Sequence, residues 1–78
     1  MIFKRLRDLR EDNDIKQITL ADYLHVKQST YSDYENGKIN IPIDQLIRIS
    51  DFYNVSLDFL VERTDVKTPY PRGKKNGG

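Results

Sequence analysis

Residues 17–37, QITLADYLHVKQSTYSDYENG, decide the fold of this 78-residue chain. The first part, Gln17–Leu24, repeats apolar residues at three- and four-residue steps, which predicts a short helix with one buried face. The second part, Gln28–Asn36, also has a helical pattern, and Gly37 can adopt the left-handed conformation that ends a helix. Only residues 25–27 separate the two parts. The sequence therefore predicts two short helices joined by a three-residue turn.

The second predicted helix has an unusual exposed face. Short polar residues share this face: Gln28, Ser29, Ser32 and Asp33. Tyr31 and Tyr34 fall on the opposite side and are predicted to lie in the core. Short polar side chains make a poor core, but they suit hydrogen bonding to base edges in the DNA major groove. In a helix-turn-helix the second helix enters that groove while the first crosses the backbone, so we expect the second helix to read bases.

Three further helices are predicted around this unit. Residues 2–12 repeat apolar residues at helical steps. Pro42 suits the start of a fourth helix, which ends near Asn54. Ser56 is a good cap for a short fifth helix that reaches about Val61. We therefore expect an all-α domain of five short helices, in which helices two and three form the helix-turn-helix.

The last thirteen residues differ in composition from the rest of the chain. Residues 66–78 are rich in Pro, Gly and Lys, so we expect a folded domain over residues 1–65 followed by a disordered tail. The tail carries four Lys or Arg and no acid (+4), whereas residues 1–65 carry nine Lys or Arg and twelve Asp or Glu (−3). The folded part is thus not broadly basic, and any contact with nucleic acid must rest on a few placed groups, helped by the tail.

The composition also argues against several classes of function. The chain has no cysteine and one histidine, so we expect neither a disulfide framework nor a structural zinc site. It contains no apolar run as long as a membrane span or a signal-peptide core, which indicates a cytosolic location. It shows no nucleophile–base pair and no glycine-rich phosphate loop. We therefore expect a protein that is not an enzyme and that needs no cofactor or metal.

Over about residues 3–65 the chain resembles the Cro/phage-repressor type of helix-turn-helix, also called the XRE family. The residues that carry the resemblance are Gln17, Leu20-Ala21, Leu24, Val26, Glu35-Asn36-Gly37 and Val55-Ser56-Leu57-Asp58. The resemblance implies a compact five-helix, lambda-repressor-like domain. It also implies a cytoplasmic bacterial or phage transcriptional regulator, usually a repressor, that binds a palindromic DNA operator as a homodimer.

The resemblance assigns roles to single residues by position. The residues implied to contact bases are Gln28, Ser29, Ser32 and Asp33. The residues implied to contact the DNA backbone are Lys16, Gln17, Lys27, Asn36 and Lys38. Arg10 and Glu35 match a charge pair buried between the first and third helices, and a charge on the apolar stripe of the first helix would need such a partner. Leu57 and Phe59 are near the end where the family dimerises, and we expect them to be exposed apolar anchors. We expect the dimer contact to include the Lys38–Ile43 loop as well.

Two positions depart from the family pattern. His25 occupies the turn position that is usually glycine, and we expect an ordinary surface residue there, because histidine tolerates positive φ. The reading helix has no arginine and carries Asp33, which is either a solvated acid or a base contact. Gln17 is likewise either an exposed helix-start residue or a phosphate contact. The alternative function is a protein-interaction module, or an antitoxin-like partner, built on the same fold; salt-dependent binding of a short duplex separates the two.

Overall fold

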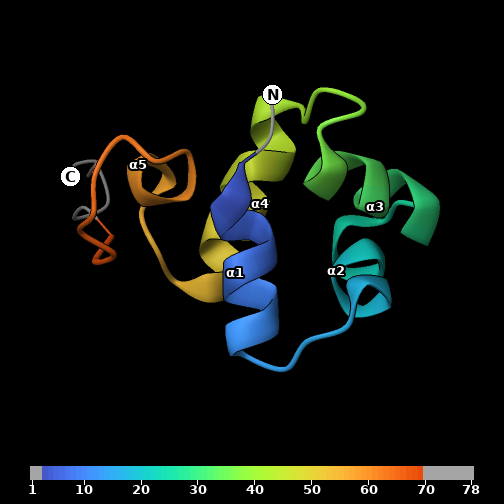
Figure 1. Cartoon of the computed structure of the whole chain (residues 1–78), viewed down its shortest axis with the longest axis horizontal. Helices are drawn as coiled ribbons and strands as arrows, with labels where there is room; N and C mark the ends of the chain where they lie inside the picture. The colour runs from blue at the N-terminus through green and yellow to red at the C-terminus, as the bar shows by residue number, and fades with distance from the viewer. Residues whose placement is uncertain (1–2, 70–78) are drawn as a thin grey trace, which may run out of the picture.

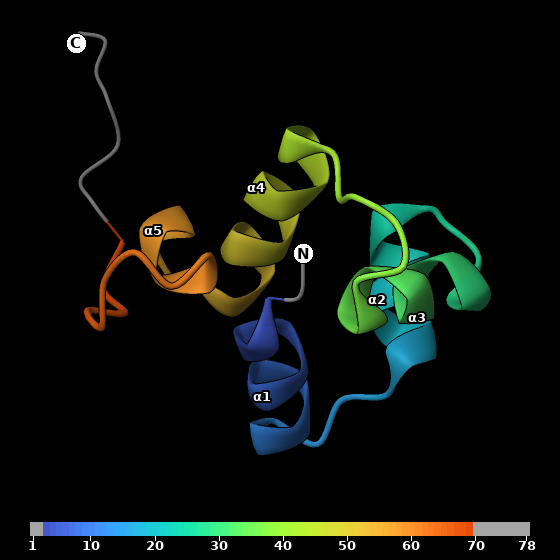
Figure 2. The ribbon, with the colours of Figure 1, turned by 45° about the horizontal axis from the view of Figure 1, so that its top comes forward.

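The computed structural model describes residues 3–69, and these residues contain five helices and no strand. The helices are α1 (Lys4–Asp12), α2 (Gln17–Leu24), α3 (Gln28–Asn36), α4 (Ile43–Tyr53) and α5 (Leu57–Leu60). The all-α prediction is confirmed, and the bounds predicted for the second and third helices coincide with those of α2 and α3. Figures 1 and 2 show α2 and α3 together at one end of the molecule and α5 at the other. The α1 and α4 helices lie between these two ends (Figure 1).

The core draws on every helix. The largest fully buried side chains are Leu6 from α1, Leu20 and Leu24 from α2, Tyr31 from α3, Ile49 from α4 and Leu60 from α5. Complete burial of one such side chain stabilises a fold by about 1.5–3 kcal/mol. Because each helix contributes at least one, even the four-residue α5 is held by packing rather than by its own helix propensity.

The helix ends follow from the residues found there. His25, Gly37 and Asn54 end α2, α3 and α4 in the left-handed conformation, with φ of 59°, 72° and 54°. The tolerance of positive φ predicted for His25 is therefore observed. Ser56 caps α5, because its hydroxyl oxygen accepts a hydrogen bond of 2.9 Å from the backbone N–H of Phe59. These ends make the connections short enough to hold five helices around one core.

The segment that follows α5 is attached to α1 through Arg5. The Arg5 guanidinium donates to the carbonyl oxygens of Phe59 and Thr64, at 2.8 and 2.6 Å, and pairs with Asp65 at 2.7 Å. It also lies 4.0 Å from the centre of the Phe59 ring, a cation–π arrangement. The backbone N–H of Ser56 donates to the carbonyl of Lys67 at 2.9 Å. Lys67 lies within the predicted tail, and this hydrogen bond connects it to the start of α5. The domain boundary after residue 65 and the disorder of the tail stay predictions. Residues 70–78 lie outside the described part of the chain.

Candidate nucleic-acid interface

The α2–α3 pair forms one packed unit. The turn between the helices begins at His25, and the N–H of Val26 donates to the carbonyl of Ala21 at 3.0 Å. Tyr31 and Tyr34 are 0% and 5% exposed, as predicted for core residues. Their rings meet edge to face with centroids 6.4 Å apart. The two tyrosines therefore fix which side of α3 faces the core and which side faces solvent.

The solvent-facing side of α3 carries the four candidate base-contact residues. Gln28 and Ser29 are exposed in the first turn of the helix. Ser32 and Asp33, one turn later, are half-buried. The spacing thus places two short polar side chains in each of two successive turns, on the side opposite the tyrosines. The structure brings these four residues to one face, and their contact with bases stays a prediction.

Glu35 is the centre of a polar cluster between α1, α2 and α3. Its carboxylate is fully enclosed, and Arg10 pairs with it through Nε at 2.7 Å and Nη2 at 3.1 Å. This is the pair that the sequence predicts. The Gln17 amide donates to the same carboxylate at 3.2 Å, and Arg7 Nε lies 3.5 Å from it. One buried acid thereby attaches α3 to both α1 and α2.

The protonation of this cluster follows from burial and from its partners. Burial alone would raise the pKa of Glu35, but the hydrogen bond from Arg10 and the neighbouring Tyr31 and Gln17 side chains lower it below the usual value. The hydrogen bond to Glu35 raises the pKa of Arg10. Burial, and then the nearby Glu35 carboxylate, raise the pKa of Tyr31. The buried Tyr31 hydroxyl has no hydrogen-bond partner among residues 3–69. Arg10 and Glu35 are therefore both charged at neutral pH.

Arg7 is a member of this cluster that the sequence analysis missed. Its Nη2 donates to Oδ1 of Asn36 at 2.7 Å, and Nδ2 of Asn36 lies 3.3 Å from Oγ of Ser32. The Arg7 side chain is 48% exposed, whereas that of Arg10 is 14% exposed. A signal was present in the sequence, because Arg7 and Arg10 are three residues apart and so share one face of α1.

Comparison with known proteins agrees with this arrangement. A model of the helix-turn-helix family matches residues 6–60. The chain belongs to the helix-turn-helix family. The resemblance to the XRE type is thus confirmed, and α2, the turn and α3 are its helix-turn-helix.

The curated relatives are named as regulators. The chain is 32% identical over 69 residues to the uncharacterized HTH-type transcriptional regulator YobD of Bacillus subtilis. It is 32% identical over 63 residues to the HTH-type transcriptional regulator ImmR of the same organism, and 29% identical over 65 residues to the cryptic phage CTXphi transcriptional repressor RstR of Vibrio cholerae. These matches cover 88%, 81% and 83% of this chain. They span only 62%, 50% and 59% of the three relatives.

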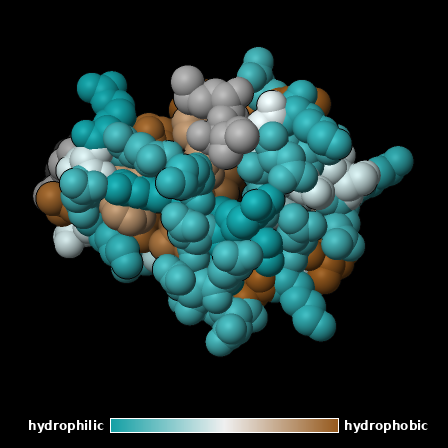
Figure 3. Space-filling view, viewed as in Figure 1, coloured by the Kyte–Doolittle hydropathy of each residue, from teal (hydrophilic) through white to brown (hydrophobic). Residues whose placement is uncertain are grey.

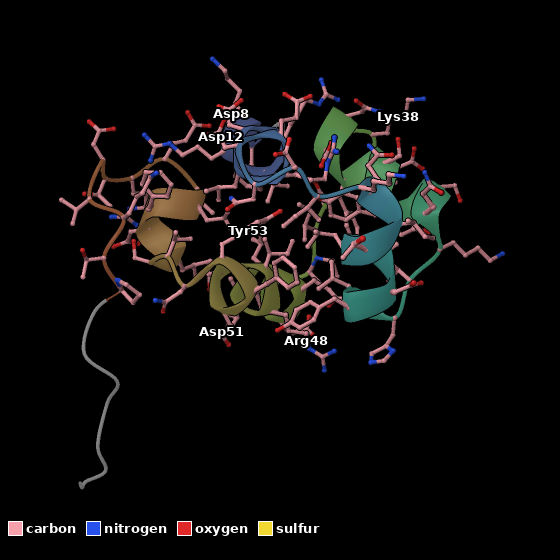
Figure 4. The ribbon with its side chains drawn as sticks, turned by 90° about the horizontal axis from the view of Figure 1, so that it is seen from below. Asp8, Asp12, Lys38, Arg48, Asp51 and Tyr53 are labelled. Atoms are coloured by element: carbon pink, nitrogen blue, oxygen red, sulfur yellow. The ribbon has the colours of Figure 1, made fainter. Side chains whose placement is uncertain are left out.

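The candidate backbone-contact residues lie around the ends of the helix-turn-helix. Lys16 and Lys27 immediately precede α2 and α3, and Lys38 follows the end of α3; all three are exposed. Gln17 and Asn36 are also candidates, but each already makes a side-chain hydrogen bond within the protein. In Figure 4, Lys38 lies on the same side of the molecule as Asp8 and Asp12, whereas Arg48 and Asp51 lie on the other side. Phosphate contact at these residues stays a prediction.

One expectation about the dimer residues is wrong. Phe59 is 7% exposed, because it packs in the core and Arg5 covers its ring. Leu57 is half-buried. Ile39 and Ile43, which belong to the loop expected at the dimer contact, are exposed, and so are Ile47 and Val66. For Ile47 the sequence offered a signal, since this residue lies four residues after Ile43 and off the buried stripe of α4.

Three further observations concern the surface and the helices of residues 3–69. In Figure 3 one face of the molecule is mainly hydrophilic, and apolar groups appear there in separate patches. Within residues 3–69, none of the helices has the length and apolar character needed to cross a membrane. Over the same residues, no three His, Cys, Asp or Glu side chains gather as they would around a metal ion.

Proposed function

We propose that this chain binds a specific double-stranded DNA operator and acts in the cytoplasm as a transcriptional repressor. In this proposal α3 enters the major groove, and α2 lies across the backbone beside it. The observation that carries the proposal is the solvent-facing side of α3, where Gln28, Ser29, Ser32 and Asp33 form one polar face. The buried Glu35 cluster holds this face in a fixed orientation. The repressor name of the Vibrio relative supports repression rather than activation.

Phosphate binding is proposed at the ends of the two helices. Lys16 and Lys27 stand where the unpaired N–H groups of α2 and α3 begin, and such ends favour anions. Gln17 uses one amide hydrogen on Glu35, so its second amide hydrogen is available to a phosphate oxygen. Residues 1–65 carry a net charge of −3, so these few cations must act locally. The proposal therefore predicts binding that is weak on random DNA.

We also propose a homodimer on DNA. One reading helix covers few bases, and two copies related by a two-fold axis would read half-sites about 34 Å apart on a palindrome. The exposed Ile39, Ile43 and Ile47, with the half-buried Leu57, are better candidates for the contact than Phe59. The same exposed isoleucines favour the second candidate function, in which the fold binds a protein partner instead of DNA.

The test begins with selection of bound sites from random DNA. The selected duplex and a scrambled duplex are then titrated at several salt concentrations, and log affinity should fall linearly with log salt. Lys27→Ala should reduce the magnitude of this slope by about 1, the change expected when one phosphate contact is lost. Arg63→Ala is the matched control, because it removes one positive charge from an exposed residue after α5 that lies outside the predicted tail, and it should leave the slope unchanged. If no duplex is selected and no salt-dependent binding appears, the protein-partner function takes precedence.

A further inference from the structure

The contacts of Ser32 point to the kind of base edge that it reads. Ser32 is one of the four candidate base contacts on α3, and it is joined to α1 through Asn36 and Arg7. Two hydrogen bonds, Arg7 to Asn36 and Asn36 to Ser32, thus connect α1 to the exposed side of α3. Arg7 also joins these bonds to the Arg10–Glu35 pair, because Arg7 Nε lies 3.5 Å from the Glu35 carboxylate.

Arg7 decides the orientation of the Asn36 amide. A guanidinium has only donors, so the atom of Asn36 that lies 2.7 Å from Arg7 Nη2 must be its carbonyl oxygen. The amide nitrogen then faces the other way, toward Oγ of Ser32 at 3.3 Å. Because that nitrogen has only hydrogens to offer, the Ser32 oxygen is the acceptor of this bond.

The Ser32 proton is consequently left for an external partner. A helical serine often donates to a carbonyl one turn earlier, as Ser50 does here to Ile47 at 2.7 Å. Among residues 3–69, Ser32 makes no such bond, and its only side-chain hydrogen bond is the one it accepts from Asn36. Asp33, the next residue, carries an ionised carboxylate that can only accept. This part of α3 thus offers one donor beside one acceptor.

We propose that Ser32 donates to a hydrogen-bond acceptor on the edge of one base, and that Arg7 is the positioning residue that sets this polarity through Asn36. The acceptors that the major groove offers are purine N7, guanine O6 and thymine O4. Cytosine offers only its N4 amine there, so it would be disfavoured at the contacted position. This inference rests on the proposed DNA-reading function and names the chemistry that Ser32 recognises.

The experiment reverses the polarity of the contact. Each base of the selected half-site is replaced in turn, and each purine also by its 7-deaza analogue, which lacks the N7 acceptor. Ser32→Ala should abolish the preference at one position, worth about fivefold in affinity, and keep it elsewhere. In Asn36→Asp the new carboxylate still binds Arg7 but can only accept, so it turns the serine proton inward. That variant should switch the same position toward a base with an amino donor, adenine or cytosine.

Two further variants complete the test. Arg7→Met frees the Asn36 amide to rotate, so the preference at that position should relax without reversing. Asn40→Asp makes the same charge change as Asn36→Asp in the exposed loop after α3, and it should leave the preference at every position intact. If Asn36→Asp lowers affinity for every duplex by the same factor and leaves the preference at that position unchanged, the inference is overturned while DNA reading stands. If the parent protein shows no preference at any position, the proposed function itself falls.

Discussion

Arginines on α1 attach both ends of the molecule, but they do so in different surroundings. At the α2–α3 end, Arg10 meets a Glu35 carboxylate that is fully enclosed. At the α5 end, Arg5 meets an Asp65 side chain that is 97% exposed, and its other partners are backbone carbonyls. An enclosed carboxylate has no water to replace a lost partner, whereas an exposed one does. The α3 helix is therefore attached firmly, and the segment after α5 only loosely.

The largest expected effect comes from breaking the enclosed pair. Glu35→Gln keeps the size of the side chain but leaves Arg10 without its counter-charge, and loss of one member of a buried pair typically costs roughly 3–5 kcal/mol. Urea unfolding followed by circular dichroism measures the loss. Asp65→Asn is the matched control at the other end of α1, and it should unfold at nearly the parent urea concentration. Equal urea midpoints for the two variants would show that the enclosed pair stabilises the fold no more than the exposed pair does.

The pH dependence of stability should reveal the contribution of the Glu35 carboxylate. The folded-state pKa of Glu35 is lowered, so the unfolded chain binds a proton more readily than the folded protein does. The stabilisation from this group is therefore complete above the ordinary glutamate pKa of about 4.3 and is lost as the pH falls through the lower folded-state value. Thermal unfolding between pH 6 and pH 2 should show the parent losing this stabilisation. Glu35→Gln should lack that component, and a decline of the same size in both proteins would contradict the assignment.

A smaller effect is expected at Arg5. Arg5→Met preserves much of the contact with the Phe59 ring but removes the bonds to the carbonyls of Phe59 and Thr64. Such charge-assisted bonds at a partly exposed site stabilise a fold by about 1–2 kcal/mol. Hydrogen exchange should show faster exchange in residues 56–67 while the protection of α3 is unchanged. Faster exchange throughout the chain would mean that Arg5 holds the whole core.

The smallest expected effect on folding comes from the basic tail. Deletion of residues 68–78 keeps the Ser56–Lys67 hydrogen bond and removes Arg72, Lys74 and Lys75. The unfolding midpoint should change little. Binding to all duplexes should weaken about equally and the salt slope should flatten, because phosphate contacts do not depend on sequence. An unchanged salt slope would show that the tail makes no phosphate contact.

The features predictable from the sequence were those with a local cause. Apolar spacing and the ends at His25 and Gly37 predicted α2 and α3. An arginine on the apolar stripe of α1 indicated that a partner is needed, and the family resemblance named Glu35. The contacts of Arg5 were missed, because its partners lie 54–60 residues away in the chain. The spacing of apolar residues within a helix does not reveal contacts with such distant segments. The burial of Phe59 was missed for the same reason. A four-residue helix is too short to reveal which of its faces is covered.

The base-reading face was predicted from residue type, but its internal order was not. Gln28, Ser29, Ser32 and Asp33 share the exposed side of α3 as their spacing indicates. The link from Ser32 through Asn36 to Arg7 depends on how α1 packs against α3, which a single sequence does not reveal. The sequence therefore predicts which residues form the candidate site, a prediction that still has to be tested, and the structure adds how these residues are oriented.

The most direct test of base reading by α3 is a pair of binding curves for Gln28→Ala at one salt concentration. Gln28 is exposed in the first turn of α3, where its amide can donate and accept at adenine N6 and N7. The account predicts a loss of about 1–3 kcal/mol on the selected operator and almost none on the scrambled duplex. Equal weakening on both duplexes would contradict it, because a residue that lowers all binding alike does not read sequence.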